Sequence, residues 1–163
     1  MNNIILIGMA GCGKSTLGVL LAKSLGMNFL DTDLVIQQRE GKRLQEIINN
    51  DGLEYFKRAE DAALLSVDVN DTVIATGGSA VYYDDAMAHL KSGGKCVWLS
   101  LPYEEIEHRI RNIKTRGIAI APGKTLFDVF EERQPLYKKY ADIIVDCSSS
   151  AEDNVAAIIK ALG

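Results

Sequence analysis

The segment from residue 8 to residue 15 reads Gly8-Met9-Ala10-Gly11-Cys12-Gly13-Lys14-Ser15. It matches the pattern G-x-x-x-x-G-K-[ST] in full, and that pattern has meaning only between a strand and a helix. An unbroken apolar run, Ile4 to Ile7, precedes the segment, and apolar residues recur at helical spacing from Lys14 to Leu25. Glycines let such a loop curl so that its N–H groups converge on phosphate oxygens in front of a helix N-terminus. The segment therefore predicts a strand, a phosphate-binding loop and a helix.

Nucleotide binding is the chemistry that this loop favours. In this motif the lysine, Lys14, reaches the β- and γ-phosphates, and the hydroxyl of Ser15 contacts Mg²⁺. We add Thr16 as a further phosphate contact. The candidate nucleotide-binding residues of the loop are Gly8, Gly11, Cys12, Gly13, Lys14, Ser15 and Thr16. We expect ATP and Mg²⁺ as the cofactors.

Strand and helix patterns alternate along the rest of the chain. Apolar runs predict five strands, at residues 3–7, 29–31, 72–76, 96–99 and 143–145. Helical periodicity lies between and after them, at residues 14–25, 32–50 with a break at Gly41, 52–67, 84–91, 103–113, 125–139 and 151–162. This order predicts an α/β, three-layer P-loop NTPase fold, with a five-stranded parallel sheet and helices on both faces. We expect residues 1–163 to form one domain, with a mobile lid loop at about 112–124 and an acceptor-binding segment at about 32–60.

Composition excludes several other classes of protein. Of the 163 residues 47% are hydrophobic and 25% are charged, as in ordinary globular proteins. The formal net charge of −4 argues against sequence-independent binding of nucleic acid, which needs a basic surface. No apolar run reaches the roughly 18 residues that cross a bilayer, and no basic leader precedes the first apolar run. The three cysteines lack any metal-binding or disulfide spacing, so we expect a cytoplasmic protein with no membrane or nucleic-acid partner.

Two carboxylates follow the second expected strand, in Asp31-Thr32-Asp33. Ligands of parallel α/β sheets bind at the carboxyl ends of the strands, where this segment and the phosphate loop both fall. One carboxylate can hold Mg²⁺ through water, and the other can orient an attacking hydroxyl group or take its proton. The segment could also serve only as a helix N-cap. Since no N-K-x-D base-reading motif is present, we favour a small-molecule or nucleotide kinase over a switch GTPase.

The chain resembles the shikimate kinases over nearly its whole length. The resemblance rests on the phosphate loop, the D-x-D at Asp31 to Asp33, Thr76-Gly77-Gly78 and Arg133-Gln134-Pro135-Leu136-Tyr137, in this order. It implies an enzyme of the nucleoside-monophosphate-kinase type that moves the γ-phosphate of ATP to the 3-hydroxyl of shikimate. It also implies a monomer.

The resemblance also implies a role for individual residues. Asp33 would act as the base or orienting group, and Asp31 would hold Mg²⁺ together with Ser15. Gly77 and Gly78 would bring backbone N–H groups to the acceptor, and Arg133 would pair with its carboxylate through a planar fork. Arg109 would lie over the adenine, and Arg116 would be the lid arginine that reaches the transferring phosphate. The catalytic candidates are thus Lys14, Asp33 and Arg116.

The chain departs from the family pattern at three places near the acceptor. Lys57 stands where the family has an arginine, and Arg58, about 100° further round the helix, is the alternative cation. Ser79 stands where the family has a third glycine, and the lid reads Arg116-Gly117-Ile118-Ala119-Ile120 in place of Arg-Pro-Leu-Leu. The candidate acceptor-binding residues are Asp33, Lys57, Arg58, Gly77, Gly78, Ser79 and Arg133. Tyr82 and Tyr83 follow this turn closely enough to line a pocket, but we do not assign them to the site.

Two other functions remain open on the sequence alone. A kinase of the same build could act on another hydroxylated acid or sugar acid, and Lys57 and Ser79 would then reflect that different acceptor. A nucleotide-binding relative without phosphotransfer would bind ATP and turn over no acceptor. The second alternative is disfavoured because five residues suited to phosphotransfer are all retained: Lys14, Ser15, Asp31, Asp33 and Arg116.

Overall fold

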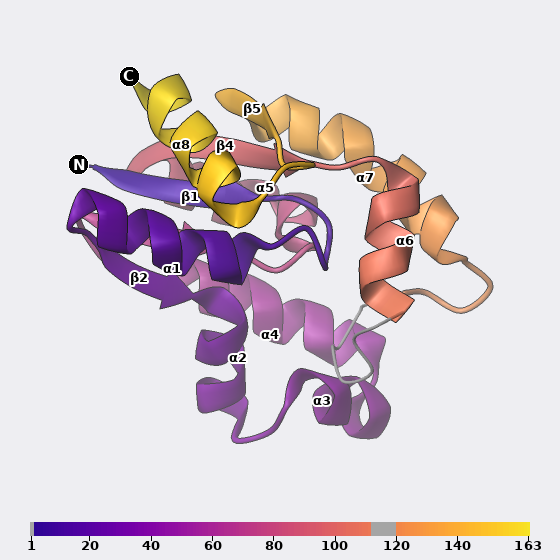
Figure 1. The fold of residues 1–163 in the computed structure, drawn as a ribbon. Coiled ribbons are helices and arrows are strands. Elements are labelled where there is room, and N and C mark those ends of the chain that lie inside the picture. Colours follow the sequence, from indigo (N-terminus) through magenta and orange to yellow (C-terminus); the bar gives the residue numbers. More distant parts are fainter. Residues whose placement is uncertain (1, 112–119) are drawn as a thin grey trace.

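The computed structural model describes residues 2–111 and 120–163, and its centre is a parallel sheet (Figure 1). The sheet has five strands in the order β2-β3-β1-β4-β5, and every neighbouring pair is parallel. The strands are β1 (Asn3–Ile7), β2 (Asn28–Asp31), β3 (Thr72–Ala75), β4 (Gly94–Ser100) and β5 (Ile143–Asp146). The predicted fold class, α/β with a five-stranded parallel sheet, is confirmed.

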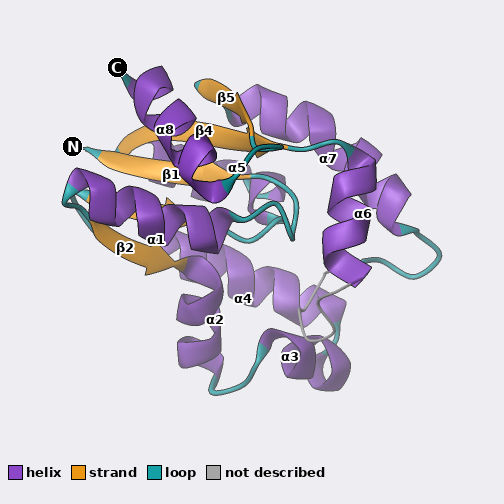
Figure 2. Ribbon diagram, viewed as in Figure 1, coloured by secondary structure: helices purple, strands orange, loops and turns teal. Residues whose placement is uncertain are grey.

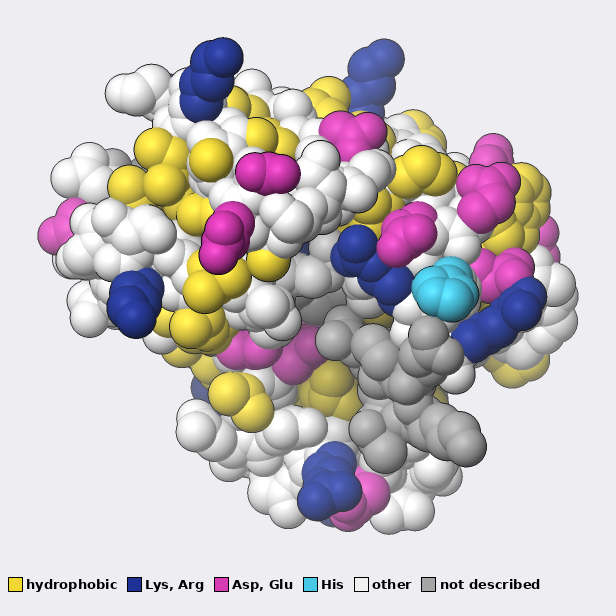
Figure 3. All heavy atoms as spheres, in the orientation of Figure 1, with side chains coloured by type: hydrophobic (Ala, Val, Ile, Leu, Met, Phe, Trp, Pro, Cys, Tyr) yellow, Lys and Arg dark blue, Asp and Glu magenta, His cyan; other side chains and the backbone are white. Residues whose placement is uncertain are grey.

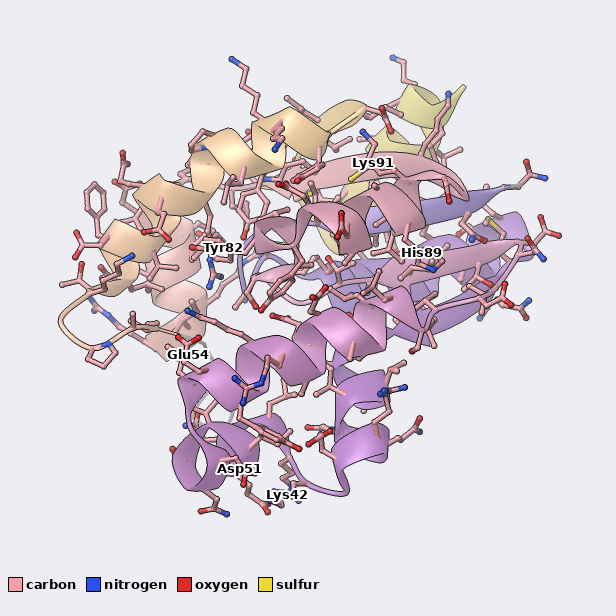
Figure 4. The ribbon with its side chains drawn as sticks, turned by 180° about the vertical axis from the view of Figure 1, so that it is seen from behind. Lys42, Asp51, Glu54, Tyr82, His89 and Lys91 are labelled. Carbon is pink, nitrogen blue, oxygen red and sulfur yellow. The ribbon has the colours of Figure 1, made fainter. Side chains whose placement is uncertain are left out.

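Helices cover both faces of the sheet and make three layers (Figure 2). The first helices along the chain are α1 (Lys14–Leu25), α2 (Thr32–Glu40), α3 (Leu44–Asp51) and α4 (Leu53–Leu65). A 3₁₀ turn η1 (Ala80–Tyr82), α5 (Asp84–Lys91), α6 (Tyr103–Arg111), α7 (Leu126–Tyr140) and α8 (Ala151–Leu162) follow. Helices α1 and α8 lie on one face, whereas α4, α5 and α7 lie on the other (Figure 1, and from behind Figure 4). The phosphate loop emerges from the middle of this arrangement, between β1 and α1.

Strand β1 is central because all of its residues can be buried. Ile5, Leu6 and Ile7 are fully buried, and the strand pairs with β3 on one side and with β4 on the other. Continuous apolar runs are typical of parallel strands covered on both faces. The large hydrophobic core forms around this strand, between the two helical layers.

A second, smaller hydrophobic cluster joins the three helices α2, α3 and α4. Its buried members are Ile36, Leu44, Ile47, Phe56 and Ala63. These helices extend from the sheet at the lower part of Figure 1. The expected helical stretch 32–50 is therefore two helices, because Gly41 ends α2 in a left-handed conformation (φ 68°) that suits glycine.

Several expected boundaries are shifted by one or two residues. Helix α4 covers Leu53–Leu65 where 52–67 was expected, and β4 covers Gly94–Ser100 where 96–99 was expected. Helix α7 begins one residue later than expected, because Thr125 is its N-cap and forms a capping box with Asp128. The turn η1 was not expected at all. Of the expected lid, residues 112–119 lie outside the described residues.

Among the described residues, no helix is both long enough and apolar enough to span a bilayer. Cys12, Cys96 and Cys147 are buried free thiols. Burial raises the pKa of the Cys96 thiol to about 12.

Candidate active site

The phosphate loop closes around the side chain of its own lysine. Gly13 takes a left-handed conformation (φ 97°) and is the N-cap of α1, so glycine is favoured there. Lys14 is 5% exposed, and its Nζ donates hydrogen bonds to the carbonyl oxygens of Gly8 (2.7 Å) and Met9 (2.8 Å). The loop therefore has a cation inside it and a helix N-terminus behind it, which is a site for an anion.

The remaining loop residues differ in exposure. Ser15 and Thr16 are exposed in the first turn of α1, whereas the side chain of Cys12 is fully buried. The buried thiol leaves Cys12 able to contribute only its backbone to a ligand. From helix α6, Arg109 reaches the loop and donates from Nη1 to the carbonyl oxygen of Gly11 at 3.4 Å.

Asp31 and Ser15 bring two oxygen ligands together beside the loop. The Oγ of Ser15 donates to Oδ2 of Asp31 at 2.8 Å, although the two residues come from different elements. The other oxygen of Asp31 accepts the backbone N–H of Asp33 at 2.9 Å and so caps helix α2. The N-cap interpretation of this segment is thus correct for Asp31, and one of its oxygens still faces the loop. Asp33 stands one residue into α2.

Gly77 and Gly78 lie between residues at the start of α2 and the phosphate loop and the buried side chains of Glu60 and Arg133. A Cβ built on Gly77 would approach Oδ1 of Asp33 to 2.7 Å and Oε2 of Glu60 to 3.0 Å. A Cβ built on Gly78 would approach Nη1 of Arg133 to 2.8 Å and the backbone nitrogen of Ala10 to 3.1 Å. A side chain at either position would therefore displace a group of the site, because residues from several elements converge on this turn.

A cavity of about 300 Å³ opens next to this turn. Its walls come from α4, from the segment after Gly78, from α7 and from the chain just before α7. The lining residues are Leu53, Lys57, Ser79, Tyr82, Tyr83, Ala121, Lys124, Val129, Glu132 and Arg133. The cavity combines cations and hydroxyl groups on a largely apolar wall, which suits a small polar anion. In the view of Figure 3, acidic side chains are visible in a recess between the main body of the molecule and the helices α2 and α3.

Of the two alternative cations, Lys57 lines the cavity and Arg58 does not. The side chain of Lys57 is 45% exposed, and its Nζ pairs with Oε1 of Glu54 at 3.4 Å. The guanidinium of Arg58 lies over the ring of Tyr55, 5.9 Å from its centre. Arg58 is therefore turned away from the other acceptor-binding candidates. Arg116 lies outside the described residues.

Glu60, which the sequence analysis did not select, is a buried carboxyl group in the middle of the site. Its Oε1 accepts hydrogen bonds from Oγ of Ser79 (2.5 Å) and from the hydroxyl of Tyr83 (2.9 Å). Burial, reinforced by the nearby Asp33 charge, raises the pKa of Glu60 to about 7, while the two hydroxyl donors and Arg133 oppose this rise. A spacing signal existed: Glu60 is four residues after Phe56, so it shares the buried face of the helix.

Tyr82 and Tyr83 were also missed, and both line the cavity. The hydroxyl of Tyr82 donates to Oε1 of Glu132 at 2.6 Å, and the hydroxyl of Tyr83 donates to Glu60. Burial and the Glu60 carboxylate raise the pKa of Tyr83, so this hydroxyl stays protonated at neutral pH. Their closeness to the glycine turn was the signal in the sequence, but it does not specify which partners they contact.

The fold and the site define a class of protein, the P-loop kinases. A phosphate-binding loop lies at the carboxyl end of the central strand, and an acceptor-sized cavity lies beside it. An anion-binding loop alone would serve many nucleotide-binding proteins, whereas a separate polar cavity next to it provides a place for an acceptor.

Comparison with known proteins identifies the family within this class. The shikimate kinase family model matches residues 10–163. A shikimate kinase from Pseudomonas paraeruginosa is 40% identical over 152 residues, which cover 90% of this chain and 87% of the relative. The crystal structure of shikimate kinase from Aquifex aeolicus has a TM-score of 0.84 and 35% identity, over 98% of this chain and 95% of that one. A shikimate kinase from Acinetobacter baumannii in complex with shikimate has a TM-score of 0.88 and 30% identity, over 99% and 93%.

The chain belongs to the shikimate kinase family. It is an ATP-dependent phosphotransferase whose acceptor is a hydroxyl group.

Proposed function

We propose that this protein transfers the γ-phosphate of ATP to the 3-hydroxyl of shikimate. The observation that carries the proposal is the position of Gly78 between the two halves of the site. The same point of the chain approaches the backbone of the phosphate loop at Ala10 and the guanidinium of Arg133. An acceptor whose carboxylate pairs with Arg133 would thus have its hydroxyl groups next to the phosphate loop. The relative from Acinetobacter baumannii was solved with shikimate bound, which supports this choice of acceptor.

On the nucleotide side, we assign phosphate binding to Gly8, Gly11, Cys12, Gly13, Lys14, Ser15 and Thr16. Lys14 stabilises charge on the transferring phosphate, because its ammonium group is already buried inside the loop. Arg109 binds the nucleotide at the edge of the loop, beside the Gly11 carbonyl. The lid role of Arg116 rests on the sequence pattern alone.

Ser15 and Asp31 fit a magnesium ion. Their side-chain oxygens are 2.8 Å apart, and hydroxyl and carboxylate oxygens are the ligands that Mg²⁺ prefers. Among the described residues no group of three or more His, Cys, Asp or Glu could hold a metal by itself. Two protein ligands completed by phosphates and water are the usual arrangement for Mg²⁺ at a nucleotide. When bound there, Mg²⁺ neutralises charge on the phosphates.

On the acceptor side, Asp33 orients the attacking hydroxyl and takes its proton. Arg133 binds the acceptor carboxylate, because a buried guanidinium offers a planar fork in a site where water is scarce. Lys57, rather than Arg58, supplies the second cation, since it lines the cavity. Gly77 and Gly78 let the acceptor approach the backbone, and Ser79 acts by bonding to Glu60.

We further propose that residues 1–163 act as one kinase domain and as a monomer in the cytoplasm. The acceptor-binding segment is 32–60, and the lid spans about 112–124. Buried free thiols suit a reducing compartment. Light scattering coupled to size-exclusion chromatography would test the monomer.

The direct test is ADP release from Mg-ATP with and without millimolar shikimate, measured on the purified protein in a coupled assay. We expect turnover that depends on shikimate, and a phosphate on the 3-hydroxyl of the product by ³¹P and ¹H NMR. The proposal would be contradicted if shikimate did not increase the rate of ADP release in a sample in which ATP binding is confirmed. Gluconate and other hydroxylated acids in parallel wells would then show whether a different acceptor is used.

A further inference from the structure

Tyr82, on the turn η1, connects the charged residues along one wall of the cavity. Its hydroxyl oxygen accepts a hydrogen bond from Nε of Arg133 at 3.4 Å and donates one to Oε1 of Glu132 at 2.6 Å. Glu132 in turn accepts a hydrogen bond from Nζ of Lys124. The side chain lies between helices α4 and α7 in the view from behind (Figure 4). The Tyr82 hydroxyl, together with Glu132, therefore connects Lys124, which precedes α7, to the buried Arg133 in α7.

The direction of these hydrogen bonds follows from the chemistry of a phenol. A phenol has one proton to donate, and its remaining capacity is to accept. Because Glu132 takes that proton, the lone pairs of the Tyr82 oxygen are left to face Arg133. The carboxylate at Glu132 thus fixes which way the Tyr82 hydroxyl presents itself to the arginine.

The ring of Tyr82 makes a second contact with the same guanidinium. The guanidinium carbon of Arg133 lies 5.4 Å from the ring centre, within the range of a cation–π interaction. At the other end, Nη1 of Arg133 packs against Gly78, where an added Cβ would come within 2.8 Å. Arg133 is 2% exposed, so few alternative positions are open to its side chain. Tyr137 also interacts with the Arg133 side chain. Tyr82, with its ring and its hydroxyl, and Gly78 thus both contribute to the plane and the direction of the fork.

Orientation matters because an arginine binds a carboxylate through two parallel N–H donors in one plane. We propose that Tyr82 is a positioning residue that holds the Arg133 guanidinium in the orientation for the shikimate carboxylate. This inference rests on the proposed function. It gives a role to a side chain that touches Arg133 rather than the reacting atoms.

The variant Tyr82→Phe removes the hydroxyl and keeps the ring. We expect the KM for shikimate to rise roughly three- to tenfold, which is the net contribution of one typical intramolecular hydrogen bond. We expect kcat to stay within about twofold and the KM for ATP to be unchanged. A loss of general stability would lower kcat and affect both substrates, so the split between the two KM values separates positioning from a structural role.

The matched control is Tyr55→Phe. Tyr55 also donates its hydroxyl to a carboxylate, that of Glu40, but it is exposed on α4 and outside the cavity. Tyr55→Phe, like Tyr82→Phe, removes a phenol hydroxyl that donates a hydrogen bond to a carboxylate. We expect wild-type kinetics for both substrates.

Binding of the methyl ester of shikimate tests whether Tyr82 acts on the substrate carboxylate by orienting Arg133. By calorimetry, we expect Tyr82→Phe to weaken the binding of shikimate and to leave the ester at its wild-type Kd, because the ester has no carboxylate for the fork. Equal weakening of both ligands would overturn the inference, and so would an unchanged KM for shikimate in Tyr82→Phe. If wild-type protein failed to use shikimate at all, the proposed function would fail first, and this inference with it.

Discussion

The phosphate loop and the acceptor cavity meet at Gly78, but they are built in opposite ways. The loop is one continuous segment, and Lys14 bonds to carbonyl oxygens only a few residues away, at Gly8 and Met9. The cavity wall comes from four separate parts of the chain, and its contacts join residues such as Tyr82 and Arg133, 51 positions apart. A site formed by the backbone of one segment can be predicted from a short sequence motif. A site formed by side chains that are far apart in the sequence can be predicted only when the fold is known.

The two lysines of the site show the same difference. Lys14 is buried and holds two backbone carbonyls, while the side chain of Lys57 is 45% exposed and makes one long ion pair with Glu54. An exposed pair of this kind contributes little to stability. Lys57 is therefore able to exchange its partner for a ligand at small cost.

The largest expected effect is that of Asp33→Asn. Replacing the carboxylate removes the proton acceptor while keeping the shape, so we expect kcat to fall by roughly 10²–10⁴-fold. A fluorescent ADP analogue should bind with its wild-type Kd, since the phosphate loop is untouched.

The control for that variant is Asp68→Asn, at an exposed loop position outside the site. It should keep full activity. Wild-type turnover in Asp33→Asn would show that Asp33 is not the proton acceptor. It would also contradict the assignment of this residue to the acceptor half of the site.

Lys14→Arg tests how tightly the phosphate loop fits around the ammonium group of its lysine. The loop closes tightly around the lysine ammonium, and a wider guanidinium would displace the carbonyls that it now contacts. We expect kcat to fall by about 10²–10³-fold, the usual cost of losing a group aligned with the developing charge. Lys23→Arg, at the exposed end of the same helix, is the control. Activity near wild type in Lys14→Arg would show that the loop is less rigid than its contacts indicate.

Glu60→Gln tests the buried carboxyl group through pH. The pKa of Glu60 is about 7 in the folded protein, against an ordinary value of 4.5. Between these values the folded state keeps a proton that the unfolded state has lost. The free energy of unfolding therefore falls as pH rises from about 4.5 to about 7, by on the order of 3 kcal/mol from this group.

In the Gln variant this contribution disappears. Urea unfolding at a series of pH values between 5 and 8 would measure the difference between the two proteins, in which the other carboxylates cancel. We expect the wild type to lose stability relative to Glu60→Gln as pH rises. Parallel curves would mean that the pKa of Glu60 is not raised.

The smallest expected effect is that of Lys57→Arg. The planar fork of arginine binds a carboxylate through two bonds where lysine offers a point charge, so we expect the KM for shikimate to fall a few-fold. Steady-state kinetics with Lys42→Arg as the control would measure it, because Lys42 pairs with Asp51 at the outer side of the helices α2 and α3 (Figure 4). A higher KM in Lys57→Arg would indicate that the cavity is shaped for lysine.

Much of the fold could be predicted because its signals are local. The apolar run from Ile4 to Ile7 can be satisfied only in a strand covered on both faces, and the glycines after it require a loop. Strand and helix boundaries were less certain, because they depend on single hydrogen bonds. The N-cap at Thr125, which delays α7 by one residue, is an example.

The acceptor half could be predicted only in outline. The family pattern indicated a cation at position 57 or 58, and only the packing of α4 distinguishes them. Phe56 is buried in the cluster between α2, α3 and α4, which turns Lys57 to the cavity and leaves Arg58 over Tyr55. Glu60 gave a weak signal through its spacing from Phe56. Tyr82 gave only its closeness to the glycine turn, and its contact with Arg133 could not be predicted because the two residues are 51 positions apart.

By itself, the sequence determined the parallel α/β architecture, the phosphate loop and the membership of a kinase family, because each of these depends on contiguous residues or on periodicity. Tertiary structure alone decided which cation faces the cavity, that Glu60 is a buried carboxyl group with a raised pKa, and that Tyr82 contacts Arg133. The physical reason is that burial and side-chain contact are properties of packed elements. They arise only where α4, the turn after Gly78 and α7 come together.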